Sequence, residues 1–153
     1  MSRIFVLGAL ALLALPAHAD DAPNACELVT PDEINAIATK KVERVLPQKS
    51  GNPSECGFID SHKAAVLVVN VRMVQYAVKD ELFQERETVE KIYHTKSKEI
   101  DGVGEGAYWL GANHQLGFRK GHAIVNVRFA TPKNQNENDS AQIARLIEAR
   151  LPK

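Results

Sequence analysis

The stretch from Gly104 to Ala130 constrains the fold of this chain more than any other part of the sequence. Apolar and polar residues alternate along it, as they do in strands with one buried face. Two dipeptides that suit tight hairpin turns, Gly111-Ala112 and Lys120-Gly121, divide the stretch into three parts. The pattern therefore predicts a meander of three antiparallel strands.

The two turns also predict which side of the sheet each side chain faces, because a slip of one residue would reverse every side chain. With both dipeptides as loops, His114 lies opposite Val127 on one neighbouring strand and opposite Trp109 on the other. One face then collects Ala107, Trp109, Leu116, Phe118, Ala123, Val125, Val127 and Phe129. The other face carries Tyr108, Asn113, Gln115, Arg119, Asn126 and Arg128, with Leu110 and Ile124 as apolar exceptions.

A second β-rich segment precedes this meander. Cys56 to Ile59 and Ala64 to Met73 predict a hairpin in which Cys56 points into the core. Val69-Asn70-Val71-Arg72-Met73 is echoed by Val125-Asn126-Val127-Arg128-Phe129, and Gly57-Phe58 by Gly117-Phe118. The echoes suggest an α-βββ-α-βββ-α plan; a chance similarity between hairpins is the alternative.

Three helices are expected around these strands. The first begins with Thr30 as N-cap, Pro31 at the first helical position and Glu33 three residues after the cap. The others span Val78 to Tyr93 and Asp139 to Leu151, each with a single apolar stripe. We therefore expect an α+β fold in which an antiparallel sheet has its helices packed on one face.

Residues 1–19 have the features of a secretory signal peptide, with Arg3 before an apolar run and cleavage expected near Ala19. Residues 20–153 then form a single domain in the periplasm or outside the cell. The whole chain has 19 basic and 19 acidic residues, and loss of Arg3 leaves 18 basic ones. This balance gives no reason to expect nucleic acid as a partner, and no later segment predicts a membrane span.

The two cysteines, Cys26 and Cys56, are expected to form a disulfide, because exported compartments are oxidising. Lipidation of Cys26 is the alternative. Only the small residue before Cys26 agrees with a lipoprotein signal, so a soluble form is favoured. A metal site would need further ligands at a recognisable spacing, and the sequence has none.

Several short motifs resemble a large group of exported cell-envelope proteins. They are Cys26-x-Leu28-Val29-Thr30 followed by Asp32-Glu33, Cys56-x-Phe58, and Gly102-Val103-Gly104-Glu105-x-Ala107. The group includes actinobacterial lipoproteins of unknown function and, more distantly, the extracellular sensor domains of mycobacterial serine/threonine kinases. The resemblance implies an α+β domain with a cysteine bridge, and it offers no enzymatic activity that could be carried over to this chain. This chain differs from the lipoproteins in lacking their lipidation motif.

The sequence contains no recognisable catalytic, cofactor-binding or metal-binding motif. Gly102-Val103-Gly104-Glu105-Gly106 precedes a strand, whereas a dinucleotide-binding loop follows one, so a conformational role is expected. The histidines at 62, 94, 114 and 122 do not have metal-binding spacing, and His114 and His122 are expected on opposite faces. Structural or solvated roles are therefore expected for them.

These observations favour an exported, non-enzymatic binding or accessory module of the cell envelope. Its partner would be an envelope protein, a wall component or a small ligand. The alternatives are an enzyme whose site is assembled from distant residues and a purely structural or inhibitor-like accessory protein. The expected binding surface is the polar sheet face turned away from the helices, which holds Asn70, Arg72, Tyr108, Gln115, Ile124, Asn126 and Arg128.

Overall fold

A computed structural model describes residues 21–75 and 79–152 and confirms the α+β class. The expected signal peptide lies outside the described residues. In chain order the elements are η1 (Ala25–Glu27), α1 (Pro31–Asn35), β1 (Arg44–Lys49), β2 (Ser54–Ile59), β3 (Ala65–Met73), α2 (Lys79–Tyr93), β4 (Lys98–Glu99), β5 (Ala107–Leu110), β6 (Gln115–Lys120), β7 (Ala123–Phe129), η2 (Pro132–Asn134) and α3 (Glu137–Glu148).

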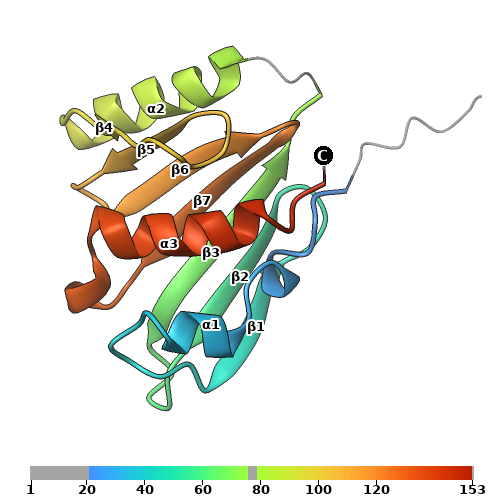
Figure 1. The fold of residues 1–153 in the computed structure, drawn as a ribbon, viewed down its shortest axis with the longest axis vertical. Coiled ribbons are helices and arrows are strands. Elements are labelled where there is room, and N and C mark those ends of the chain that lie inside the picture. Colours follow the sequence, from blue (N-terminus) through green and yellow to red (C-terminus); the bar gives the residue numbers. More distant parts are fainter. Residues whose placement is uncertain (1–20, 76–78, 153) are drawn as a thin grey trace, which may run out of the picture.

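The strands form one sheet of seven in the order β1-β2-β3-β7-β6-β5-β4, and every neighbouring pair is antiparallel (Figure 1). The first three strands and the last four therefore form two successive meanders, which join through β3 and β7. Apart from the two-residue strand β4, the order of elements follows the α-βββ-α-βββ-α plan.

The register differs from the predicted one by two residues, which leaves every side chain on its expected face. Leu116 pairs with Val127 and with Trp109, the positions predicted for His114. His114 instead lies in a longer turn with a φ of 55°, and its ring centroid is 6.4 Å from that of Trp109. The sequence predicted that two turns exist but misplaced both. The turn between β6 and β7 lies at Gly121-His122, one residue later than predicted, and the loop between β5 and β6 is longer than the expected two residues.

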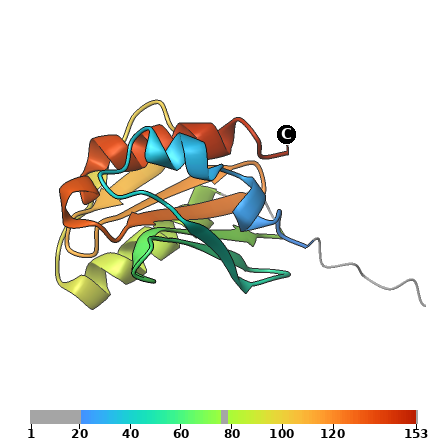
Figure 2. The ribbon, with the colours of Figure 1, turned by 90° about the horizontal axis from the view of Figure 1, so that it is seen from below.

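The inner face of the sheet, which we define by Leu116, Phe118, Val125, Val127 and Phe129, packs against α1 and α3 (Figure 2). These apolar side chains form the main core together with residues of the two helices. The contributing helical residues are Ile34, Ile143, Ala144 and Ile147.

The start of α1 has the predicted cap. The Thr30 side chain accepts a hydrogen bond from the Glu33 backbone N–H, and the Glu33 carboxylate accepts one from the Thr30 backbone N–H at 2.9 Å. The helix ends at Asn35, earlier than expected, and Ile37 and Ala38 pack against the core from the following turn.

The predicted disulfide is present. Cys56 points from β2 into the core and is bonded to Cys26 of η1, 30 positions earlier in the sequence. The bond fastens the N-terminal segment to the inner face. This segment also makes a buried hydrogen bond to β2, from the Ala25 N–H to Ser54 Oγ at 3.0 Å.

The third helix corrects the expectation that all helices share one face. Figure 2 shows α2 on the opposite side of the sheet from α1 and α3, where it lies over β5 and β6. We call this side the outer face. Tyr108, Leu110 and Ile124 are buried there outside the main core, which explains the apolar exceptions in the sequence pattern.

The two echoed segments meet at the centre of the sheet. Asn70 of β3 lies opposite Asn126 of β7, with a valine on each side of both residues. The strands of the two halves are therefore related by an approximate two-fold rotation normal to the sheet. The helices do not follow this symmetry, because α1 and α2 lie on opposite faces.

Candidate interaction face

The contacts that fasten α2 to the outer face are largely polar. Arg72 of β3 forms ion pairs with Glu81 at 3.2 Å and with Glu85 at 3.0 Å. The two carboxylates are one helical turn apart and so reach the same guanidinium. Leu82 of α2 also lies close to Gly106. None of the described side chains of α2 belongs to the main core.

Tyr108 of β5 also fastens α2, on the same face of the sheet. Its ring is buried, and its hydroxyl donates a hydrogen bond to Glu85 Oε1 at 3.0 Å. Burial and the nearby Glu85 carboxylate raise the pKa of Tyr108, so the hydroxyl remains protonated. The ring also covers Gly117 on β6, where a Cβ atom would lie 2.5 Å from the ring.

Amide side chains extend the network along the sheet. Gln115 donates from Nε2 to the Tyr108 hydroxyl at 3.1 Å and to Asn126 Oδ1 at 2.6 Å. Asn70, opposite Asn126, donates to Glu55 at 3.1 Å. A continuous polar path therefore crosses the outer face from α2 to the middle of the sheet.

Beyond this path, α2 leaves part of the outer face open. We define the open half by Arg44, Leu46, Val68 and Arg128. The register gives the order Leu46, Gly57, Val68 and Arg128 across β1, β2, β3 and β7. Leu46 is 41% exposed, and both arginines are exposed without an ion pair among the described residues. The open half thus combines the apolar side chains of Leu46 and Val68 with two exposed arginines, and the Gln48 side chain lies over Gly57 between the two apolar residues.

The seven residues of the expected binding face have divided roles. Four of them belong to the hydrogen-bond network that includes Glu85 of α2: Arg72, Tyr108, Gln115 and Asn126. Ile124 is fully buried. Only Arg128 is freely exposed.

The structure also shows that Arg72 and Arg128 are not adjacent. Arg128 lies opposite Val68, four residues before Arg72 on β3. This separation is about 13 Å along the strand. The two arginines therefore do not converge on one carboxylate or phosphate.

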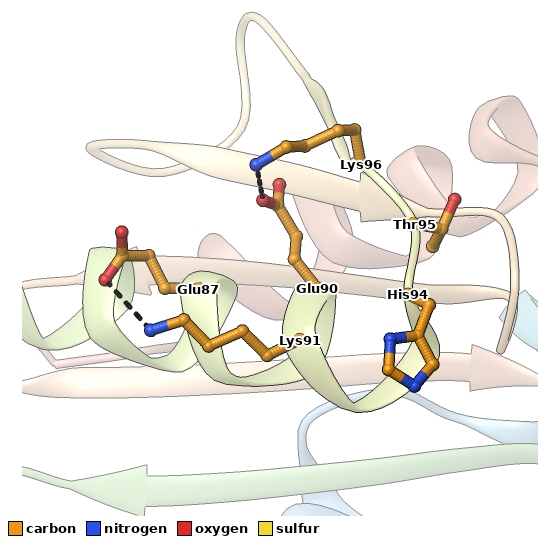
Figure 3. A pocket seen from close by; sticks show the side chains of 6 residues that line it. All are labelled: Glu87, Glu90, Lys91, His94, Thr95 and Lys96. Atoms are coloured by element: carbon orange, nitrogen blue, oxygen red, sulfur yellow. Dashed lines mark hydrogen bonds and ion pairs between the residues drawn. The ribbon is translucent and has the colours of Figure 1, made fainter.

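A surface hollow of about 430 Å³ lies at the C-terminal end of α2, lined by Glu87, Glu90, Lys91, His94, Thr95 and Lys96 (Figure 3). Glu90 is engaged in the turn that ends the helix, because its carboxylate accepts hydrogen bonds from Ser97 N at 2.9 Å and Ser97 Oγ at 2.6 Å. These bonds, with Lys96, lower the pKa of Glu90 to about 2. The hollow is thus lined by a helix-ending motif.

The other residues considered for chemistry lie apart. His122 Nδ1 is 3.0 Å from the Val74 carbonyl oxygen, and His114 lies in the turn beside Trp109. Within the described residues, no group of three or more His, Cys, Asp or Glu side chains could hold a metal ion. Gly104 has a φ of 57°, and a side chain there would collide with the Arg119 carbonyl, in keeping with a conformational role for this loop.

Sequence reasoning missed Glu81 and Glu85 as partners of the sheet, because their contacts with Arg72 and Tyr108 join residues that are distant in sequence. Leu110 and Ile124 were the available signal, since two apolar residues on a polar face indicate that something covers them. The described part of the chain contains no helix with the length and apolar character needed to cross a membrane.

No family model matches the chain, and a comparison with curated proteins found no match in sequence. The resemblance to the exported Cys-x-Leu-x-Thr proteins therefore stays an expectation drawn from short motifs. Any function must be argued from the outer face itself.

Proposed function

We propose that this protein is an exported, non-enzymatic module of the cell envelope that binds a macromolecular partner through the open half of its outer face. The observation that carries the proposal is the surface composition of this region. Leu46 and Val68 supply apolar area between the two arginines, which is a typical composition for a protein interface. Arginines are also common anchors at interfaces.

The positions of the ionisable groups near α2 favour binding over catalysis. Glu85 is shared between Arg72 and Tyr108, and Glu90 is held by Ser97 and Lys96. A general acid or base needs a free proton-transfer position beside the substrate. These carboxylates are used instead to hold α2 in place.

The proposal can be tested by placing a photoreactive amino acid at position 46 or 128 and irradiating cells that export the protein. We expect a discrete covalent adduct from both positions, because both side chains are exposed on the open half. The same substitution at the exposed Gln142 of α3 is the control and should give none. The absence of adducts at 46 and 128, or identical adducts from all three positions, would reject the proposed site.

The alternative functions predict other outcomes in the same experiment. A purely structural accessory protein would give adducts spread over several faces. An enzyme with an assembled site would give transient contacts near ionisable groups, and substitution of Arg128 would leave its turnover unchanged. A single adduct that depends on the open half would separate the proposed module from both.

A further inference from the structure

The exposed large hydrophobic side chains of this protein are concentrated on its outer side. Among the described residues they are Leu46, Phe83, Ile92 and Tyr93, with exposed fractions from 41% to 64%. Leu46 belongs to the open half, and the other three belong to α2. The side of the sheet covered by α1 and α3 has no such residue among those described. Leu46 lies on the edge strand β1 and α2 lies over β5 and β6, so these apolar groups form two separate sites on one side of the sheet.

The outer face has two levels, because α2 stands above the sheet beside the uncovered open half. A second copy can fit this shape. α2 lies over β5 and β6 and reaches Arg72 on β3, and it leaves open the part of β1, β2, β3 and β7 around Leu46, Val68 and Arg128. Three strand spacings make this part about 14 Å wide. A helix with its side chains is about 10 Å across, and the 15 residues of α2 extend about 22 Å. The open half is therefore large enough to receive one copy of α2.

We infer that a second copy of this chain is the partner, bound so that α2 of each copy lies on the open half of the other. A two-fold axis parallel to the sheet, between two facing outer sides, produces this arrangement. The two copies of α2 then form a shared layer between two sheets. The inference rests on the proposed use of the outer face for binding and names its partner.

The charges of the two surfaces support this arrangement. The open half has the free guanidinium groups of Arg44 and Arg128. α2 presents Glu87, whose side chain is 48% exposed and lies 4.0 Å from that of Lys91, which is 79% exposed. In the two-fold arrangement each Glu87 faces the basic open half of the partner copy. Phe83 of one copy can pack near Leu46 and Val68 of the other.

The contact occurs twice by symmetry, which doubles its area. One α2 covers roughly 220 Å² in projection, from its length and width. The total buried surface comes from two such contacts and from the sides of the two helices that touch each other. It approaches the roughly 1,200 Å² that the smallest specific interfaces bury. We therefore expect a reversible dimer that dissociates on dilution.

Sedimentation equilibrium of the purified, disulfide-intact protein tests the inference. The wild type should shift from monomer to dimer as its concentration rises. Phe83→Glu and Leu46→Glu should each weaken the dimer at least about tenfold, since each puts a charge into an apolar contact. Gln142→Glu on the exposed side of α3 is the matched control and should dimerise like the wild type.

A charge exchange tests the pairing between copies. Glu87→Arg alone, and Arg44→Glu with Arg128→Glu, should each weaken self-association through repulsion between like charges. Mixing these two variants should restore the dimer, because each contact in the mixed pair then joins opposite charges. Such restoration cannot arise from misfolded variants.

A protein that stays monomeric up to about 1 mM, a dimer unaffected by both Phe83→Glu and Leu46→Glu, or no restoration on mixing would overturn the inference. These outcomes are separable from failure of the proposed function. A monomer whose position 46 still forms an adduct with another envelope component would refute the dimer and keep the binding module. A dimer whose only adduct is a second copy would support the inference and remove the need for a different partner.

Discussion

A single carboxylate, that of Glu33, joins the first helix to the end of the chain. It accepts hydrogen bonds from Arg150 Nη2 at 2.7 Å and Nη1 at 2.8 Å, in addition to its bond with the Thr30 N–H. These partners, Arg150 foremost, lower the pKa of Glu33 to about 2 from an ordinary value of 4.5. The ionised form of Glu33 is therefore stabilised by folding.

We predict that Glu33→Gln lowers the melting temperature at pH 7 and changes it much less at pH 2. Because the pKa of Glu33 is lower in the folded state, its contribution is present above about pH 4.5 and is lost as the pH falls toward 2. Thermal unfolding across this range measures the effect. Glu99→Gln, on the exposed strand β4, is the control. An equal loss at both pH values would contradict the ionic explanation.

Gly117 is a second single residue with a wider effect, because it makes room for the Tyr108 ring that bonds to α2. A Cβ atom there would lie 2.5 Å from the Tyr108 ring, which must then move and disturb its bond to Glu85. We expect Gly117→Ala to destabilise the fold by about 1–3 kcal/mol, the usual range for an overpacked site. Gly111→Ala, where the nearest atom is 3.7 Å away, should stay within about 0.5 kcal/mol of the wild type in urea unfolding.

At the scale of elements, α2 differs from the other helices in how it is held. Its ion pairs with Arg72 are partly exposed, and such pairs contribute little to global stability, about 0–1 kcal/mol. We predict that Arg72→Ala leaves the melting temperature nearly unchanged but speeds hydrogen exchange in α2. Exchange in α3 and β7 should not change, because those elements belong to the main core.

Arg128→Ala is the matched control for this prediction, since Arg128 lies on the same face without contacting α2. It should leave exchange in α2 as in the wild type. If Arg72→Ala does not change exchange in α2, the helix is held mainly by apolar contacts.

The sequence was most informative where one local rule determined one element. The Thr30 cap, the strand alternation and the apolar stripe of α3 each gave the correct type of element. The face chosen by α2 could not be predicted in this way, because an apolar stripe does not indicate which side of the sheet its helix covers. Its side is decided by Arg72 and Tyr108, which are distant from α2 and from each other in sequence. The sequence analysis therefore placed the expected binding surface largely on residues that contact α2 or lie beneath it.

For the whole molecule, the disulfide between Cys26 and Cys56 is the main covalent restraint on the unfolded chain. The loop it closes spans 30 positions, for which the chain-entropy estimate gives a stabilisation of about 3–4 kcal/mol. We expect the double variant Cys26→Ser/Cys56→Ser to lose this amount in urea unfolding. Reduction of the wild type should give a similar loss, and much smaller losses would show that the unfolded chain is already compact.

The pairing of β3 with β7 has a consequence for folding, because it joins two distant parts of the chain. Asn70 and Asn126 are partners in space but lie in different halves of the chain, so the central contact requires a long-range encounter. Proteins dominated by such contacts fold in milliseconds to seconds. Until the halves meet, β3 and β7 both have free edges lined with valine, and such edges invite pairing between molecules. Newly synthesised chains are therefore most exposed to aggregation before their two halves join.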